Sequence, residues 1–440
     1  MNELNGIDGS QDTLAGHKTF LLVAAAVVIL AALSRFWASP LSAGPDIAQF
    51  WAFAQVFGEH GLDFYQYADA TDGTFPYWGW GYVYPPLWLL ILKLGSLATP
   101  DSFASVQVID ESWRIAAKTP IILSDLAIGG LIFWAVPGSR WKKLLFSTIW
   151  LLHPTGWYES AVFGQFDAIA AAFLLASVIL FSRGHLKLGF LFAGLAVLTK
   201  QHTFLPVVMV LAVVLQQTGF RAFARNCSVM AGVILVFSIP FLTTGNVRDY
   251  LEALFLPGWS PDYQQPLCYA FSGSSSLLTH LHNSYGWDTR GFMDYNTPVM
   301  AVAMLTALAL TRFRAVTLAQ AALVGALLFI GLNYQVNYQY LVIYIPLAIL
   351  VAGQATDLWH KLISIGLAIL PAVWMWMFDV SFWFYAYHPQ HFDVRDTLDK
   401  IGLTNYMSSD LPYVVFALCL MFVCLAYVVA TFLFWHRDNE

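Results

Sequence analysis

The sequence predicts an all-α polytopic membrane protein of about 12 transmembrane helices, and three observations support this fold class. Of the 440 residues, 58% are hydrophobic and only 11% are charged, whereas roughly 25% of the residues of a soluble protein are charged. Apolar runs near the length that crosses a bilayer recur along the chain. Basic residues gather in alternate connections between these runs, as the positive-inside rule describes. A lipid bilayer, rather than water, must therefore solvate most of the surface.

The first apolar run, residues 19–36, follows a polar start that ends in His17 and Lys18. This run is too long and begins too late for a cleaved signal, so we expect it to be the first transmembrane helix. The next apolar block, residues 86–97, would rise only about 18 Å as a helix, which is too short for a hydrocarbon core of about 30 Å. We expect this block to lie on the membrane surface.

Further apolar runs bring the predicted number of crossings to twelve. They begin near Lys118, Leu144, Phe163, Leu186, Thr203, Cys227, Thr297, Ala315, Tyr338, Lys361 and Leu411. With the N-terminus inside, the cytoplasmic segments hold 12 of the 21 basic residues: Lys18, Arg140, Lys142, Lys143, Arg183, Lys187, Arg221, Arg225, Arg312, Arg314, Lys361 and Arg437. Both chain ends are then cytoplasmic, and the long loops 37–117, 243–296 and 378–410 lie outside.

This topology divides the chain into five segments. They are a cytoplasmic tail (1–18), a catalytic module (19–245) that includes the extracytoplasmic loop 37–117, a second extracytoplasmic loop (246–296), a C-terminal transmembrane module (297–435) and a cytoplasmic tail (436–440). The cytoplasmic connections are short and carry no Walker or dinucleotide glycine pattern, so we expect any chemistry on the outer face. No outer-loop N-x-S/T site is present, which favours a prokaryotic plasma membrane.

Composition also narrows the partners. No basic run is present, so we do not expect a nucleic-acid partner. We do expect membrane lipids as partners, because most of the chain is apolar. The four cysteines form no CxxC pair, which argues against a zinc site or a disulfide framework. His388 and His391 have no third ligand nearby, so a surface loop is a better interpretation than a metal site. We expect neither a metal nor another cofactor.

The first outer loop contains a carboxylate and a row of aromatic residues. Asp46 follows a Gly-Pro turn and precedes an amphipathic helical pattern, which predicts that it occupies the helix N-cap. It is either a capping residue or a general base that faces a lipid-borne substrate. Two prolines later in the loop are flanked by aromatic side chains that fit an interfacial anchor or a wall for stacking sugars. These aromatic residues are Tyr77, Trp78, Trp80, Tyr82, Tyr84 and Trp88.

A second group of polar residues opens a span from the outer side. Glu159, Gln165 and Asp167 lie at its head, with Asp167 four or five residues inside an otherwise apolar run. An unpaired carboxylate in hydrocarbon costs several kcal/mol, so Asp167 is either part of a structural polar pair or part of a functional site.

Lys200, Gln201 and His202 lie at the outer boundary of the membrane, contrary to the positive-inside preference for lysine. Lys200 could pair with Asp167 or Glu159, or bind an anionic lipid phosphate. The alternative is a lysine that snorkels to the interface. Weaker candidates for phosphate contact are Arg114, Lys118 and Arg290.

Near the outer end of the tenth span, four polar residues form an uncharged cluster. They are Gln335, Asn337, Gln339 and Tyr340. Amides and phenols of this kind suit the hydroxyl groups of a sugar, although they also bind transmembrane helices to one another.

Several short motifs occur in a characteristic order. They are Asp46 with Gln49 and Trp51; Tyr77-Trp78-Gly79; Tyr84-Pro85-Pro86-Leu87; His153-Pro154 leading to Gly164-Gln165-Phe166-Asp167; and Lys200-Gln201 followed by Pro206. In this order they resemble the GT-C superfamily of polyprenyl-phosphate-sugar-dependent glycosyltransferases, and in detail the glucosyltransferases that extend lipid-linked oligosaccharide. The resemblance covers about the first 210 residues in detail.

One motif departs from those glucosyltransferases. Where they have a His-x-His-Glu type motif, this chain has residues 335–339, QVNYQ, and the segment that follows is more similar to the mannosyltransferase that starts glycosylphosphatidylinositol anchors. The resemblance therefore leaves mannose and glucose open as the transferred sugar.

The resemblance implies an inverting transfer on the extracytoplasmic face. Asp46 would act as the general base toward a lipid-linked or membrane-proximal glycan acceptor. Lys200, Arg290 and Arg114 would bind the phosphate of a polyprenyl-phosphate sugar donor. The remaining substrate contacts would come from Trp51, Tyr77, Trp78, Tyr84, Glu159, Gln165, Asp167, Gln201, His202, Gln335 and Gln339. The alternatives are a transporter or flippase for a lipid-linked saccharide, and a noncatalytic membrane scaffold.

Overall fold

The computed structural model describes residues 5–68, 81–105, 108–244, 247–255, 273–314, 316–386 and 411–434. Within these ranges the chain is almost entirely helical, and the only bridge between extended segments joins Ala104 to Ile109. Six of the helices are long and apolar enough to cross a membrane. They include residues Gly16–Leu41, Glu111–Ala135, Gln201–Thr218, Phe220–Thr243, Asn296–Phe313 and Tyr413–Leu433. The predicted all-α polytopic fold is confirmed, while the number of twelve crossings stays a prediction.

The N-terminal half contains the elements that later form the site. In chain order they are α1 (Asn5–Ala38), η1 (Ser39–Leu41), α2 (Pro45–His60), η2 (Gly61–Asp63), α3 (Phe64–Tyr67), α4 (Pro86–Ala98), α5 (Glu111–Ala135), α6 (Arg140–Leu151), α7 (Pro154–Trp157), the π-helix η3 (Tyr158–Phe163), α8 (Asp167–Ser182), α9 (Leu186–Thr199), η4 (Gln201–Thr203), α10 (Phe204–Thr218) and α11 (Phe220–Thr244).

The C-terminal half continues the bundle. Its elements are α12 (Val247–Phe255), α13 (Ser274–Tyr285), α14 (Arg290–Asp294), α15 (Asn296–Phe313), α16 (Leu318–Leu332), η7 (Tyr338–Tyr340), α17 (Leu341–Gln354), α18 (Leu358–Ala386) and α20 (Leu411–Leu433).

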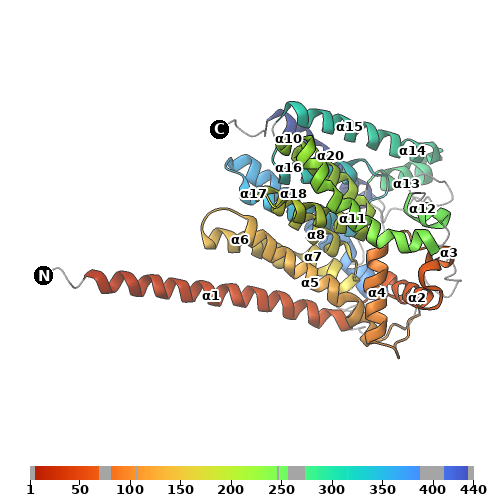
Figure 1. Cartoon of the computed structure of the whole chain (residues 1–440), viewed down its shortest axis with the longest axis horizontal. Coiled ribbons are helices and arrows are strands. Elements are labelled where there is room, and N and C mark those ends of the chain that lie inside the picture. Colours follow the sequence, from red (N-terminus) through yellow and green to blue (C-terminus); the bar gives the residue numbers. More distant parts are fainter. Residues whose placement is uncertain are drawn as a thin grey trace.

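The bundle has a fully buried centre and an apolar outer face. Nearly every side chain of α8, α16 and α17 is buried, whereas α1, α11 and α15 expose Leu, Val and Phe side chains. Exposed apolar area of this extent is normal only where lipid covers it. The helices α2, α3 and α12 gather at one end of the bundle, and both chain termini lie toward the other end (Figure 1). The short helices α2, α3 and α12 therefore lie far along the bundle from the first residues of α1.

Helix α4 is the apolar block that was expected on the membrane surface. Pro86 occupies the first helical turn, where its missing N–H costs nothing, and the helix extends to Ala98. It runs across the direction of α1 and α5, at the end of the bundle where α2 and α3 lie (Figure 1). This orientation agrees with the expected surface helix.

Two predicted spans, those beginning near Leu144 and Phe163, differ from the structure. Helix α6 has only 12 residues, and α7 and the π-helix η3 follow it as separate short pieces. Gly164 then adopts a left-handed conformation with φ of 86°, which ends η3 because no further helical turn can follow it. Helix α8 begins only at Asp167, so the prediction that Asp167 lies four or five residues inside a span is wrong.

Candidate active site

Asp46 lies in the first turn of α2, and the prediction that it caps this helix is wrong. Gly44 is the N-cap residue and Pro45 follows at the first helical position, because the fixed φ of proline fits the start of a helix. An acidic side chain in the first turn is still favoured by the helix dipole. The half-buried carboxylate of Asp46 accepts a hydrogen bond from the Gln165 Nε2 atom at its Oδ2 atom.

Gln165 reaches Asp46 from the turn between η3 and α8. Its side chain is fully buried, and its backbone N–H donates to the Glu159 carbonyl over 2.8 Å. A Cβ atom at Gly164 would lie 2.5 Å from the Ile47 Cδ1 atom, so this turn packs directly on α2. The close packing holds the amide of Gln165 beside the carboxylate of Asp46.

Lys200 forms a buried ion pair with Asp167, one of the two partners that the sequence left open. The Lys200 Nζ atom contacts the Asp167 Oδ2 atom, and the two side chains are 1% and 0% exposed. The His202 Nε2 atom lies 3.4 Å from the other oxygen, Asp167 Oδ1. Chain geometry explains the meeting, because α8 starts at Asp167 and α9 ends one residue before Lys200.

Aromatic rings surround the Lys200 ammonium. Its Nζ atom lies 4.4 Å from the ring centroid of Phe166, 5.4 Å from that of Tyr84 and 5.3 Å from that of Tyr340. Rings at these distances attract a cation through their quadrupole. The His202 ring lies beside this group, tilted against that of Tyr340 with centroids 4.6 Å apart.

Tyr84 connects the two acidic groups of the site. Burial raises the pKa of its phenol well above its usual value, and the nearby charge of Asp46, then Tyr340 and Asp167, raises the pKa further. The phenol is therefore neutral at physiological pH and remains a hydrogen-bond donor. The Tyr84 ring meets the Phe166 ring edge-on, with centroids 4.9 Å apart, and Phe166 lies in the chain between Gln165, which binds Asp46, and Asp167, which binds Lys200. These contacts bring Asp46 and the Lys200–Asp167 pair to the same part of the structure, beside Tyr84.

Three other predicted site residues adjoin this cluster, namely Gln201, Glu159 and Gln339. The Gln201 Nε2 atom donates to the Val83 carbonyl over 2.6 Å, which ties the segment before Tyr84 to the residue after Lys200. Glu159, Gln335 and Gln339 are buried. Glu159 belongs to η3, and Gln339 belongs to η7 next to Tyr340.

Trp51 packs away from the cluster. Its Nε1 atom donates to the Ser102 carbonyl over 3.2 Å, and its ring meets that of Phe103 edge-on. The indole therefore joins α2 to the loop before α5.

For the remaining predicted residues, the described part of the structure gives no contact with this cluster. Arg114 is half-buried in the first turn of α5, and Arg290 begins α14, although the structure does not describe its side chain. Tyr77, Trp78, His388 and His391 lie outside the described residues. Among the residues that are described, no three His, Cys, Asp or Glu side chains gather as metal ligands would.

Lys118 does not serve as a phosphate contact, contrary to the sequence-based expectation. Its Nζ atom is fully buried and donates to backbone carbonyls of Ser39 at 3.1 Å, Ala161 at 2.9 Å and Val162 at 2.9 Å, and to that of Ser42. These carbonyls surround the ammonium, so it has no access to a donor phosphate.

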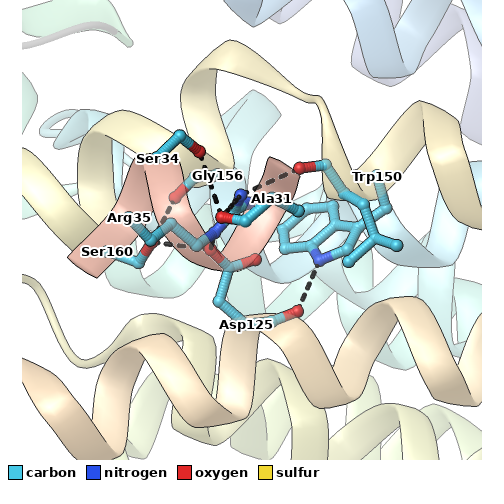
Figure 2. Close-up of polar contacts among 8 residues, drawn as sticks. Ala31, Ser34, Arg35, Asp125, Trp150, Gly156 and Ser160 are labelled. Carbon is cyan, nitrogen blue, oxygen red and sulfur yellow. Dashed lines mark hydrogen bonds and ion pairs between the residues drawn. The ribbon is translucent and has the colours of Figure 1, made fainter. Parts of the chain in front are cut away.

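A second buried ion pair, Arg35 with Asp125, escaped the sequence analysis. The Arg35 Nε atom lies 2.5 Å from the Asp125 Oδ2 atom, with 1% and 0% exposure. Figure 2 shows Ser160 donating to the same carboxylate, over 2.6 Å, and Trp150 donating to the Asp125 carbonyl. An aspartate within an apolar run is by default a functional residue, and this was the signal that could have identified it.

Residues 82–334 match glycosyltransferase family 87, which is 253 of 440 positions, since 334 − 82 + 1 is 253. The chain is also similar to the crystal structure of ArnT from Cupriavidus metallidurans in the apo state, with a TM-score of 0.48 and 18% identity over 96% of this chain and 77% of that one. No curated protein matches significantly.

The family match covers more than half of the chain and includes Tyr84, Asp167 and Lys200. It confirms the prediction that the protein is an enzyme of the glycosyltransferase class, and with it the predicted membership of the GT-C superfamily. Together with the apolar helices, it makes the protein a multi-pass membrane glycosyltransferase. The chain belongs to glycosyltransferase family 87.

Proposed function

We propose that this membrane glycosyltransferase transfers a hexose, mannose or glucose, from a polyprenyl-phosphate donor to a lipid-linked or membrane-proximal glycan. The observation that carries the proposal is the set of contacts that places Asp46 and the Lys200–Asp167 pair beside Tyr84 and Phe166. A sugar transfer with a phosphate leaving group needs a base for the acceptor and a cation for the phosphate. Asp46 can serve as the base, and Lys200 can serve as the cation.

Asp46 is the proposed general base. The hydrogen bond from Gln165 holds its Oδ2 atom, so that the carboxylate can accept the proton of an acceptor hydroxyl. The hydroxyl oxygen attacks the anomeric carbon while the bond from that carbon to the polyprenyl phosphate breaks on the opposite face. The product is inverted at this carbon, and the phosphate leaves with the electron pair of the broken bond.

Lys200 is the proposed phosphate ligand. Asp167 occupies one of the three N–H donors of its ammonium, and the other two would serve the phosphate oxygens. Asp167 and His202 then orient the ammonium rather than react. Arg114 and Arg290 remain secondary candidates for the same phosphate.

The sugar and the acceptor would contact the rings and amides near this cluster. We assign stacking to Tyr84, since an aromatic face suits the apolar face of a sugar. Tyr77 and Trp78, which lie outside the described residues, remain predicted sugar contacts, whereas Trp51 packs on Phe103 away from the cluster. Hydroxyl contacts are assigned to Glu159, Gln165, Gln201, His202, Gln335 and Gln339. We place the site in the module of residues 19–245, on the extracytoplasmic face of a prokaryotic plasma membrane.

Purified enzyme with synthetic polyprenyl-phosphate mannose or glucose, and a total membrane lipid extract as acceptor, tests the proposal. We expect the wild type to transfer one of the two sugars and Asp46→Asn to transfer neither, because an amide cannot take the proton. Asp63→Asn is the matched control, since Asp63 is an exposed aspartate of the same loop, and it should keep full activity. Full activity of Asp46→Asn would refute the base, and no transfer of either sugar by the wild type would refute the hexose.

A further inference from the structure

One buried ammonium joins the two chain segments that carry Asp46 and Gln165. Lys118 donates to the carbonyls of Ser39 and Ser42, just before Asp46. The same Nζ atom donates to the carbonyls of Ala161 and Val162, just before Gln165. The four carbonyls come from two segments about 120 positions apart, and Lys118 belongs to neither of them.

Helix geometry explains why a cation is required at this place. Ala161 and Val162 belong to the last turn of the π-helix η3, and Ser39 follows directly on the last residue of α1. The last carbonyls of a helix have no partner within that helix, and a cation near them is favoured by the helix dipole. An ammonium has three donors that point in different directions, so Lys118 can satisfy two helix ends together.

The two segments also touch without intervening side chains. The backbone N–H of Gly44 donates to the Phe163 carbonyl over 2.8 Å, and a Cβ atom at Gly44 would lie 2.6 Å from the Phe163 ring. A Cβ atom at Gly164 would lie 3.0 Å from the Lys118 Cε atom. The contact is therefore tight, and Lys118 lies against it.

We propose that Lys118 is a positioning residue that holds the Asp46 carboxylate against the Gln165 amide. It acts through the backbone of the two segments and does not touch the substrate. The effect of Lys118 on catalysis rests on the proposed function of Asp46 as the base. Its effect on the position of Asp46 does not. The two can therefore be tested separately.

Cysteine cross-linking measures the geometric role without any activity. In a chain with Cys227, Cys268, Cys419 and Cys424 replaced by serine, the double variant Asp46→Cys/Gln165→Cys should be cross-linked readily in membranes by a short bifunctional thiol reagent, whose spacer replaces the length of the two native side chains. Adding Lys118→Met should slow this cross-linking about tenfold, because hydrogen bonds to a charged group shift a local equilibrium by at least that factor. Lys187→Met is the matched control, since Lys187 is exposed on α9, and it should leave the rate unchanged.

An equal cross-linking rate with and without Lys118→Met would overturn the proposal. If Lys118→Met does not give a monodisperse protein in detergent, Lys118→Gln replaces it, because the amide keeps some hydrogen bonding and removes only the charge. The same rate comparison then decides.

Kinetics in the otherwise unchanged chain test the catalytic consequence. Lys118→Met should lower kcat about a hundredfold, the loss that a misplacement of about 1 Å can cause, and leave the KM of the donor within about twofold. A raised KM with unchanged kcat would contradict a role in positioning the base. Slower cross-linking with unchanged kcat would support the positioning by Lys118 and refute Asp46 as the base.

Discussion

Asp125→Asn removes the anion of a buried ion pair and leaves the Arg35 guanidinium in an apolar surrounding (Figure 2). Loss of one partner of a buried pair costs about 3–5 kcal/mol of folding free energy. Two carbonyls, of Ala31 at 3.2 Å and Leu151 at 2.9 Å, still accept hydrogen bonds from the guanidinium. We therefore expect a loss in the lower half of this range, about 3–4 kcal/mol.

The measurement is reversible unfolding of the purified protein in detergent micelles, followed by circular dichroism as a denaturing detergent is added. Arg35→Met and the double variant complete a double-mutant cycle. The double variant should be less destabilised than the sum of the single variants, by about 1–3 kcal/mol, because the uncompensated charge is gone.

The exposed pair of Arg248 with Glu252 is the matched control. Its side chains are 79% and 30% exposed, and such pairs contribute about 0–1 kcal/mol. Glu252→Gln should therefore change stability by no more than this amount. A loss for Asp125→Asn no larger than that for Glu252→Gln, or additive effects in the cycle, would refute the reasoning.

Two further substitutions test the site itself. Gly164→Ala should lower the thermal midpoint of unfolding by several degrees, since a left-handed alanine costs about 1–2 kcal/mol and its Cβ atom would lie 2.5 Å from Ile47. Gly130→Ala is the control and should not lower the midpoint, because no atom lies within 4 Å of the added Cβ atom. Lys200→Met should raise the KM of the polyprenyl-phosphate donor at least about tenfold by removing a charged hydrogen bond. An unchanged KM in the transfer assay would exclude Lys200 as the phosphate ligand.

The fold class followed from composition because a bilayer imposes a simple rule. A chain with 11% charged residues cannot cover its surface with polar groups in water, and apolar runs of suitable length indicate where helices can cross the bilayer. Helix starts at Leu186, Asn296 and Leu411 lie within one residue of their predicted positions. In contrast, the breaks around η3 were missed, because one left-handed glycine within an apolar stretch changes hydropathy very little.

The list of candidate residues was also readable from the sequence. Asp46, Asp167 and Lys200 stand out because a polar residue at a membrane boundary has a high desolvation cost and needs a reason to be there. The order of the motifs around them was enough to predict a glycosyltransferase, and the match to family 87 confirms it.

What the residues do to one another depended on the tertiary structure. Lys118 and Lys200 look alike in the sequence, yet one meets four backbone carbonyls and the other a carboxylate. Their partners lie between 33 and 79 positions away, and Arg35 lies 90 positions from Asp125. Local patterns report the cost of burying a charge, whereas the partner that offsets this cost is chosen by packing between distant helices.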